Sequence, residues 1–184
     1  MTGLASRRKG YAANLAVVHY LNDHGFPHAR VRPTGAAGSD IDELPPGLEI
    51  EVKNRERWDL SGWLDKLADD MEAHESPMGA VIIKRKGTTD VSRWWFVQTF
   101  DLMGALLEDS GQSGFAVECR NLSSLETSMA MAAAEVTQAP PGRVPYVEIP
   151  RRGRGVMESY SLTTVGHGVR LLRAAGWGTP LEET

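Results

Sequence analysis

Residues 48–53, with the sequence Leu-Glu-Ile-Glu-Val-Lys, alternate strictly between apolar and charged side chains. This period of two is typical of a β-strand, because successive side chains of a strand point to opposite faces of its sheet. A Pro-Pro-Gly turn at residues 45–47 stands directly before the segment and marks where the strand begins. The pattern predicts one apolar face, formed by Leu48, Ile50 and Val52, and one charged face, formed by Glu49, Glu51 and Lys53.

Both helices and strands can be predicted around this strand. Apolar residues at helical spacing and turn residues between the apolar segments mark their bounds. The expected order is helix 8–25, strand 28–32, an extended piece at 40–42, strand 48–53, helix 60–72, strand 79–84, strand 94–100 and helix 101–107. Helices interspersed with strands in this way predict a mixed α/β fold with a central sheet.

The two longest predicted helices each have an apolar stripe. In the first helix the stripe consists of Tyr11, Leu15, Val18 and Leu21. The second helix follows Asp59, which is suited to cap its N-terminus, and its stripe consists of Leu60, Trp63, Leu64, Leu67 and Met71. Lys66 and Asp70 are expected on its solvated side.

Composition excludes several classes of protein. The chain has 184 residues, of which 41% are hydrophobic and 24% charged, as in ordinary globular domains. Its one cysteine, Cys119, cannot form an intramolecular disulfide. The net charge of −4 excludes a uniformly basic surface but not a local basic patch. We expect no membrane span, because no apolar run approaches about 20 residues. We also expect no secretory signal, because no apolar segment follows the basic residues at 7–9, and hence a cytoplasmic location.

Two acidic residues and a lysine are the best candidates for chemistry. Glu51 and Lys53 are two positions apart on the predicted strand, so their side chains share a face. Asp40 lies eleven positions before Glu51, and a strand that carries it could pair beside the first and bring the two carboxylates together. Two carboxylates form a hard oxygen site suited to Mg²⁺ or Mn²⁺. The alternative is a solvated strand face with no site.

The segments 38–41 (Gly-Ser-Asp-Ile) and 48–54 (Leu-Glu-Ile-Glu-Val-Lys-Asn) resemble the PD-(D/E)XK nuclease superfamily. More narrowly, residues 7–110 resemble the Holliday-junction-resolvase-like proteins of archaea and of actinobacterial phages. The segments 8–10, 59–65, 84–87 and 95–97 fit the phage group. The resemblance implies a restriction-endonuclease-like fold, with a central mixed sheet flanked by helices. It also implies that the protein works in the cytoplasm of a bacterium or of a phage-infected host.

The same resemblance implies metal-dependent hydrolysis of DNA, preferably branched DNA or a four-way junction. Asp40 and Glu51 would be the ligands of Mg²⁺ or Mn²⁺, the carbonyl of Val52 a third ligand, and Lys53 the catalytic lysine. Related resolvases carry a glutamate on the first helix, where this chain has Asn14. A junction has twofold symmetry and one chain holds one site, so a homodimer is expected. The open alternatives are a catalytically impaired DNA-binding protein, an assembly protein, and a nuclease for linear or single-stranded DNA.

Basic residues gather in three short clusters that could contact DNA phosphates. The first two, which we expect near the site, consist of Arg7, Arg8 and Lys9, and of Arg55 and Arg57. The third is the segment 84–86 (Lys-Arg-Lys). Ordinary solvated charge is the alternative. Trp94 and Trp95 are adjacent on a predicted strand, so one is expected to face the core and the other an interface.

Residues 111–184 resemble the second part of the first 110 and are expected to form a C-terminal β-α-β-β-α extension. Residues 115–121 are similar to residues 48–54, which aligns Glu118 with Glu51 and Arg120 with Lys53. A helix at 123–136, strands at 144–149 and 159–163, a basic turn at 151–155 and a last helix follow. The extension reads either as a degenerate partial repeat or as a coincidence of element order, and it has no counterpart of Asp40.

Overall fold

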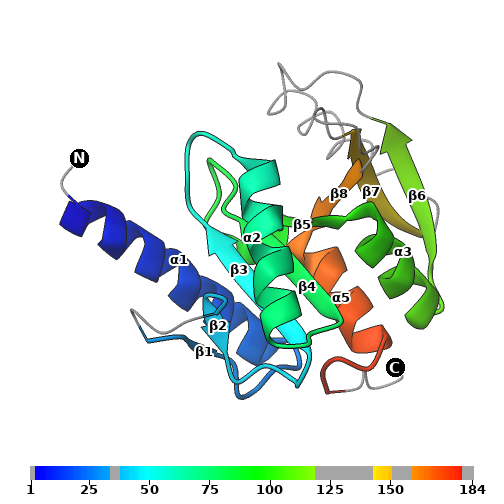
Figure 1. Cartoon of the computed structure of the whole chain (residues 1–184), viewed down its shortest axis with the longest axis horizontal. Helices are drawn as coiled ribbons and strands as arrows, with labels where there is room; N and C mark the ends of the chain where they lie inside the picture. Colours follow the sequence, from blue (N-terminus) through cyan, green and yellow to red (C-terminus); the bar gives the residue numbers. More distant parts are fainter. Residues whose placement is uncertain (1–2, 34–37, 119–142, 151–158, 180–184) are drawn as a thin grey trace.

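The computed structural model describes residues 3–33, 38–118, 143–150 and 159–179. Figure 1 shows a central sheet flanked by helices, so the α/β prediction is confirmed. The elements are α1 (Gly3–Asp23), β1 (Arg30–Val31), β2 (Ile41–Asp42), β3 (Leu48–Lys53), α2 (Leu60–Ala73), β4 (Met78–Ile83), the 3₁₀ turn η1 (Val91–Arg93), β5 (Trp95–Thr99), α3 (Phe100–Asp109), β6 (Ser113–Glu118), β7 (Arg143–Pro150), β8 (Ser159–Thr164) and α5 (Val165–Ala174).

The central sheet has six strands in the order β3-β4-β5-β8-β7-β6. The outer pairs, β3 with β4 and β6 with β7, are parallel, and the other neighbours are antiparallel. The short strands β1 and β2 form a separate antiparallel pair. The sheet is therefore mixed, as the sequence predicts.

Helices cover both faces of the sheet. Leu64 and Leu67 of α2 pack on one face, in a core cluster with residues of β4, β5, β7 and β8. Helices α1, α3 and α5 contribute to the cluster on the opposite face. Because α2 lies on the face of Glu49 and Glu51, these carboxylates are buried. The alternative interpretation of a solvated strand face is therefore wrong.

The buried face of α1 differs from the predicted stripe. Val18 and Leu21 are buried as expected, but Tyr11 and Leu15 are exposed. The helix begins at Gly3 rather than at residue 8, and its N-terminal turns extend beyond the sheet in Figure 1. Helical spacing alone does not reveal where the sheet beneath a helix ends, which explains the error.

The sheet has two halves, β3-β4-β5 and β8-β7-β6, and the strands of each half are paired in a similar way. In β3–β4, Leu48 pairs with Met78, and in β6–β7, Ser113 pairs with Arg143, so paired residues are 30 positions apart in both. One row of paired residues crosses all six strands, in the order Glu51, Val81, Val97, Leu162, Val147 and Val117. The pairing thus places Val117 at the position of Glu51, where the sequence alignment puts Glu118.

The helices that end the two halves also correspond. Thr99 accepts a hydrogen bond from the backbone N–H of Leu102 and caps α3. Thr164, which stands 65 positions later, accepts one from the N–H of His167 and caps α5. Each helix has ten residues. The helix expected at 123–136 and the basic turn at 151–155 lie outside the described residues.

Candidate active site

Asp40 reaches β3 through its side chain rather than through a strand pair. It directly precedes β2, which pairs with β1, and its Oδ2 accepts a hydrogen bond of 2.9 Å from the backbone N–H of Val52. Asp40 thereby takes the place of a neighbouring strand at the edge of the sheet. The expected approach of Asp40 to the strand of Glu51 occurs, by a different contact from the expected one.

Glu51 is the most buried of the predicted site residues, with 3% of its surface exposed. Two ammonium groups from different elements hold its two oxygens. Lys53 of β3 forms an ion pair with Oε1, and Lys66 of α2 lies 3.3 Å from Oε2. The attraction of the two lysines to this one carboxylate offsets part of the cost of burying its charge.

Burial raises the pKa of Glu51, and the negative charge of Asp40 raises it further. The hydrogen bond and charge of Lys53 and the charge of Lys66 oppose this shift without cancelling it. The effect of the Asp40 charge on Glu51 indicates that the two carboxylates face a shared region. A cation bound there would favour the ionised form of both.

Lys66 was expected on the solvated side of its helix and is a site residue that the sequence analysis missed. It also bonds to Asp70 at 2.6 Å, one helical turn further on. Burial would lower the pKa of Lys66, but the hydrogen bond to Asp70 and the charges of Glu51 and Asp70 outweigh it, so the pKa is raised. The available signal was spacing, because Lys66 and Asp70 each follow a stripe residue, Trp63 and Leu67, by three positions.

Glu49 lies two residues before Glu51 and holds the segment that carries Asp40. Its Oε2 accepts a hydrogen bond of 2.5 Å from the hydroxyl of Ser39. Its Oε1 accepts one of 3.2 Å from Ser76 and lies 3.0 Å from Nδ1 of His74. Glu49, Ser39 and Ser76 are all buried. This carboxylate therefore ties together the approach to Asp40, strand β3 and the turn between α2 and β4.

The donor set suits a hard divalent cation that keeps waters. Among the described residues, no group of three or more His, Cys, Asp or Glu side chains is arranged to hold a metal ion. The carboxylates of Asp40 and Glu51 would therefore be completed by water or phosphate oxygens, which Mg²⁺ accepts readily. The carbonyl of Val52 stays a predicted ligand. Asn14 is half-buried on α1 and makes none of the side-chain hydrogen bonds found among the described residues.

Two of the basic clusters lie close together. Asn54 donates a hydrogen bond of 3.1 Å to the carbonyl of Lys9, and Arg55 donates one of 3.4 Å to the hydroxyl of Ser6. The cluster of Arg7, Arg8 and Lys9 on α1 thus adjoins the segment after β3 that carries Arg55 and Arg57. All five of these side chains are exposed.

The third cluster begins at the same end of the sheet. The backbone N–H of Lys84 donates a hydrogen bond of 2.8 Å to the carbonyl of Lys53. Lys84 lies over the ring of Trp94, and Arg85 over that of Trp95. Both tryptophans are buried, in the two opposite core clusters, so the expectation of an interface tryptophan is wrong.

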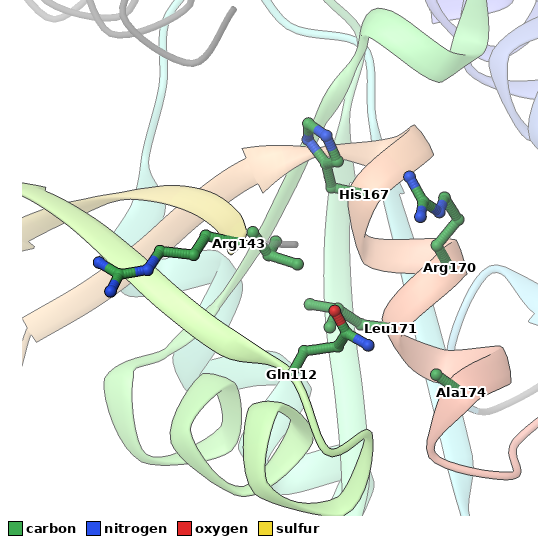
Figure 2. Close-up of a pocket in the computed structure, with 7 residues that line it drawn as sticks. Gln112, Arg143, His167, Arg170, Leu171 and Ala174 are labelled. Atoms are coloured by element: carbon green, nitrogen blue, oxygen red, sulfur yellow. The ribbon is translucent and has the colours of Figure 1, made fainter. Parts of the chain in front are cut away.

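A hollow of about 120 Å³ lies elsewhere, between α5 and the first residues of β7. Figure 2 shows His167 and Arg170 on one side of it and Gln112 below them, whereas the side chain of Arg143 extends away from the other two basic groups. Burial and the charge of Arg170 lower the pKa of His167. No predicted catalytic residue lines this hollow.

Comparison with protein-family models, with curated proteins and with solved structures found no match. Among the described residues, no helix combines the length and apolar character that crossing a membrane requires. The arrangement of the described side chains therefore carries the functional argument.

Proposed function

We propose that this chain is a metal-dependent DNA endonuclease that hydrolyses phosphodiester bonds, with a preference for branched DNA. The observation that carries the proposal is the buried carboxylate of Glu51, which lies near Asp40 and is held by Lys53 and Lys66. Even a paired buried carboxylate often stabilises a fold no more than apolar residues of similar size would, so its place in the sheet requires a reason. The sequence resemblance to PD-(D/E)XK nucleases supplies that reason.

The residues would divide the reaction between them. Asp40 and Glu51 would bind Mg²⁺ or Mn²⁺, which supplies an acidified water and stabilises charge on the phosphate. Lys53 would orient the attacking water and offset negative charge on the phosphate oxygens. The water oxygen bonds to phosphorus as the bond to the leaving sugar oxygen breaks, and that oxygen takes up a proton. Lys66 would pair with Glu51 until a cation takes its place, and it has Asp70 as its other partner.

The basic clusters support DNA as the substrate. Exposed side chains on α1 and after β3 lie at adjacent positions, where they can contact several phosphates at once. Phosphate contacts read the shape of the backbone rather than the sequence of bases, and a branched DNA differs from a duplex in that shape.

The test is cleavage of a synthetic four-way junction with Mg²⁺. Lys53→Ala should lower the rate by about 10²–10³-fold, the range found when one charge-stabilising donor is removed. Arg170→Ala is the control, because Arg170 is an exposed cation of α5 that lies outside the three basic clusters. A wild-type chain that leaves every DNA substrate intact, or an equal rate for the two variants, would defeat the proposal. Linear and single-stranded DNA in parallel reactions would establish the preference.

A second candidate function is DNA binding without cleavage, which Asn14 favours because it offers no charge where related resolvases carry a glutamate. This candidate predicts junction binding that weakens steeply with salt, together with no metal-dependent product. Asn14→Glu separates the two functions further. A gain of cleavage in this variant would assign the missing carboxylate as the cause of inactivity.

A further inference from the structure

The seam between the two halves of the sheet is formed by β5 and β8. These strands are antiparallel, and Trp95 pairs with Thr164 at one end while Thr99 pairs with Tyr160 at the other. The middle pair is Val97 with Leu162. Because Trp95 and Tyr160, like Thr99 and Thr164, stand 65 positions apart, each pair becomes the other when the halves are exchanged. The pairing therefore has the geometry of an isologous twofold interface.

The packing around the seam has the same symmetry. Val97 and Leu162 lie in one buried cluster, with Val81 on one side of the seam and Val147 on the other. Val147 stands 66 positions after Val81, so the count between the halves shifts by one residue outside the seam strands. Helices α3 and α5, which follow the two seam strands, contact each other. Without the second half, β5 would present an open sheet edge, which proteins normally cover or pair.

Among the residues that the structure describes, only one half carries the acids of the proposed site. The row through the sheet begins at Glu51 on β3 and ends at Val117 on β6. The connection from α3 to β6 consists of residues 110–112, whereas β1, β2 and Asp40 all precede β3. The second half thus has neither the room for an Asp40 counterpart nor a carboxylate at the position of Glu51.

We propose that the second half takes the place of a second subunit, so that one chain is the working unit and cuts one DNA strand in each encounter. The inference rests on the proposed function for its second part, the single cut. Its first part, one chain as the assembly, rests on the seam alone. The sequence analysis expects a homodimer because paired cuts need two sites, and the two arrangements predict different measurements.

The first measurement is the mass of the full chain in solution, by light scattering at micromolar to tens of micromolar concentrations. We expect 20.1 kDa, the mass of one chain. A stable mass of twice this value would overturn the inference. The measurement needs no substrate, so its outcome does not depend on activity.

The second measurement is cleavage of a supercoiled plasmid that extrudes a cruciform, with protein in excess over plasmid and Mg²⁺ added. A single-site unit should convert supercoiled DNA to open circles, with linear DNA appearing only later from a second, independent event. Linear DNA formed directly, without an open-circle intermediate, would overturn the single cut while the proposed function stands. A monomer that cuts no DNA would overturn both the proposed function and the single cut, and would leave the one-chain assembly in place.

Discussion

Removing the carboxylate of Glu49 tests the claim that this side chain holds the approach to Asp40. In Glu49→Ala, the hydroxyls of Ser39 and Ser76 lose their partner inside the protein. A buried hydroxyl left without a hydrogen bond costs about 1–3 kcal/mol. His74 is exposed and can turn to water, and Ser39 keeps a contact of 3.4 Å to the carbonyl of Ile41. Together with the small cavity that remains, the expected loss is about 3–5 kcal/mol of unfolding free energy.

Urea unfolding followed by tryptophan fluorescence measures this loss. Glu49→Gln keeps the volume and one acceptor oxygen, so it should cost less, about 1–2 kcal/mol. Glu56→Ala is the matched control, because Glu56 is an exposed glutamate after the same strand and its loss should change stability by less than about 0.5 kcal/mol. If Glu49→Ala costs no more than Glu56→Ala, the buried network does not stabilise the fold and the reasoning is refuted.

A second readout distinguishes positioning from general stability. Because Ser39 is adjacent to Asp40, releasing Ser39 should loosen the Asp40 carboxylate and weaken binding of Mn²⁺ in the folded variant. Calorimetric titration with Mn²⁺ well below the unfolding midpoint measures this affinity. A destabilised Glu49→Ala chain with unchanged Mn²⁺ affinity would show that Glu49 supports the fold and not the site.

Three further predictions follow from other contacts. Lys66→Met should tighten Mn²⁺ binding severalfold, because an ammonium group no longer competes for Glu51. Asp70→Asn should weaken Mn²⁺ binding, because Glu51 is then the one acidic partner left to Lys66. Lys86→Met is the control, and equal affinities in calorimetry would contradict this competition. Glu51→Val should keep the unfolding free energy within about 1 kcal/mol of the wild type while abolishing Mn²⁺ binding, since Lys53 and Lys66 can extend to water; a loss above about 3 kcal/mol would show that the ion pair stabilises the fold. Burial lowers the pKa of His167 from 6.5, so as the pH falls through 6.5 the unfolded chain takes up a proton before the folded chain, and stability falls; urea unfolding at several pH values should show a smaller fall in His167→Gln, and an identical fall would refute the argument.

The strand at residues 48–53 was predicted to the residue, and the elements up to α3 occur in the predicted order. A period of two and clear turn residues make such elements readable from local pattern alone. The pattern does not reveal what covers each face. The contacts of Glu49 with His74 and of Lys66 with Glu51 depend on how α2 lies on β3, so the pattern could not predict them.

The position of Asp40 illustrates the same limit. Sequence spacing suggests that it approaches Glu51, and the effect of Asp40 on the pKa of Glu51 agrees with that approach. The contact that brings it there is a hydrogen bond from the N–H of Val52 to a side chain. A side chain that takes the place of a neighbouring strand leaves no periodic pattern in the sequence. Only the folded structure therefore shows this contact.

The row of residues that crosses the sheet gives the strongest reason to place chemistry at Glu51. The other described side chains of that row, Val81, Val97, Leu162 and Val147, are buried and apolar. An acid in such a row costs free energy that a valine would not, even when lysines pair with it. The second half, built on the same pairing, has Val117 at the corresponding position. Sequences depart from local rules mainly where function requires it, so the difference between the two ends of one row separates the half that we propose to bind a cation from the half that completes the sheet.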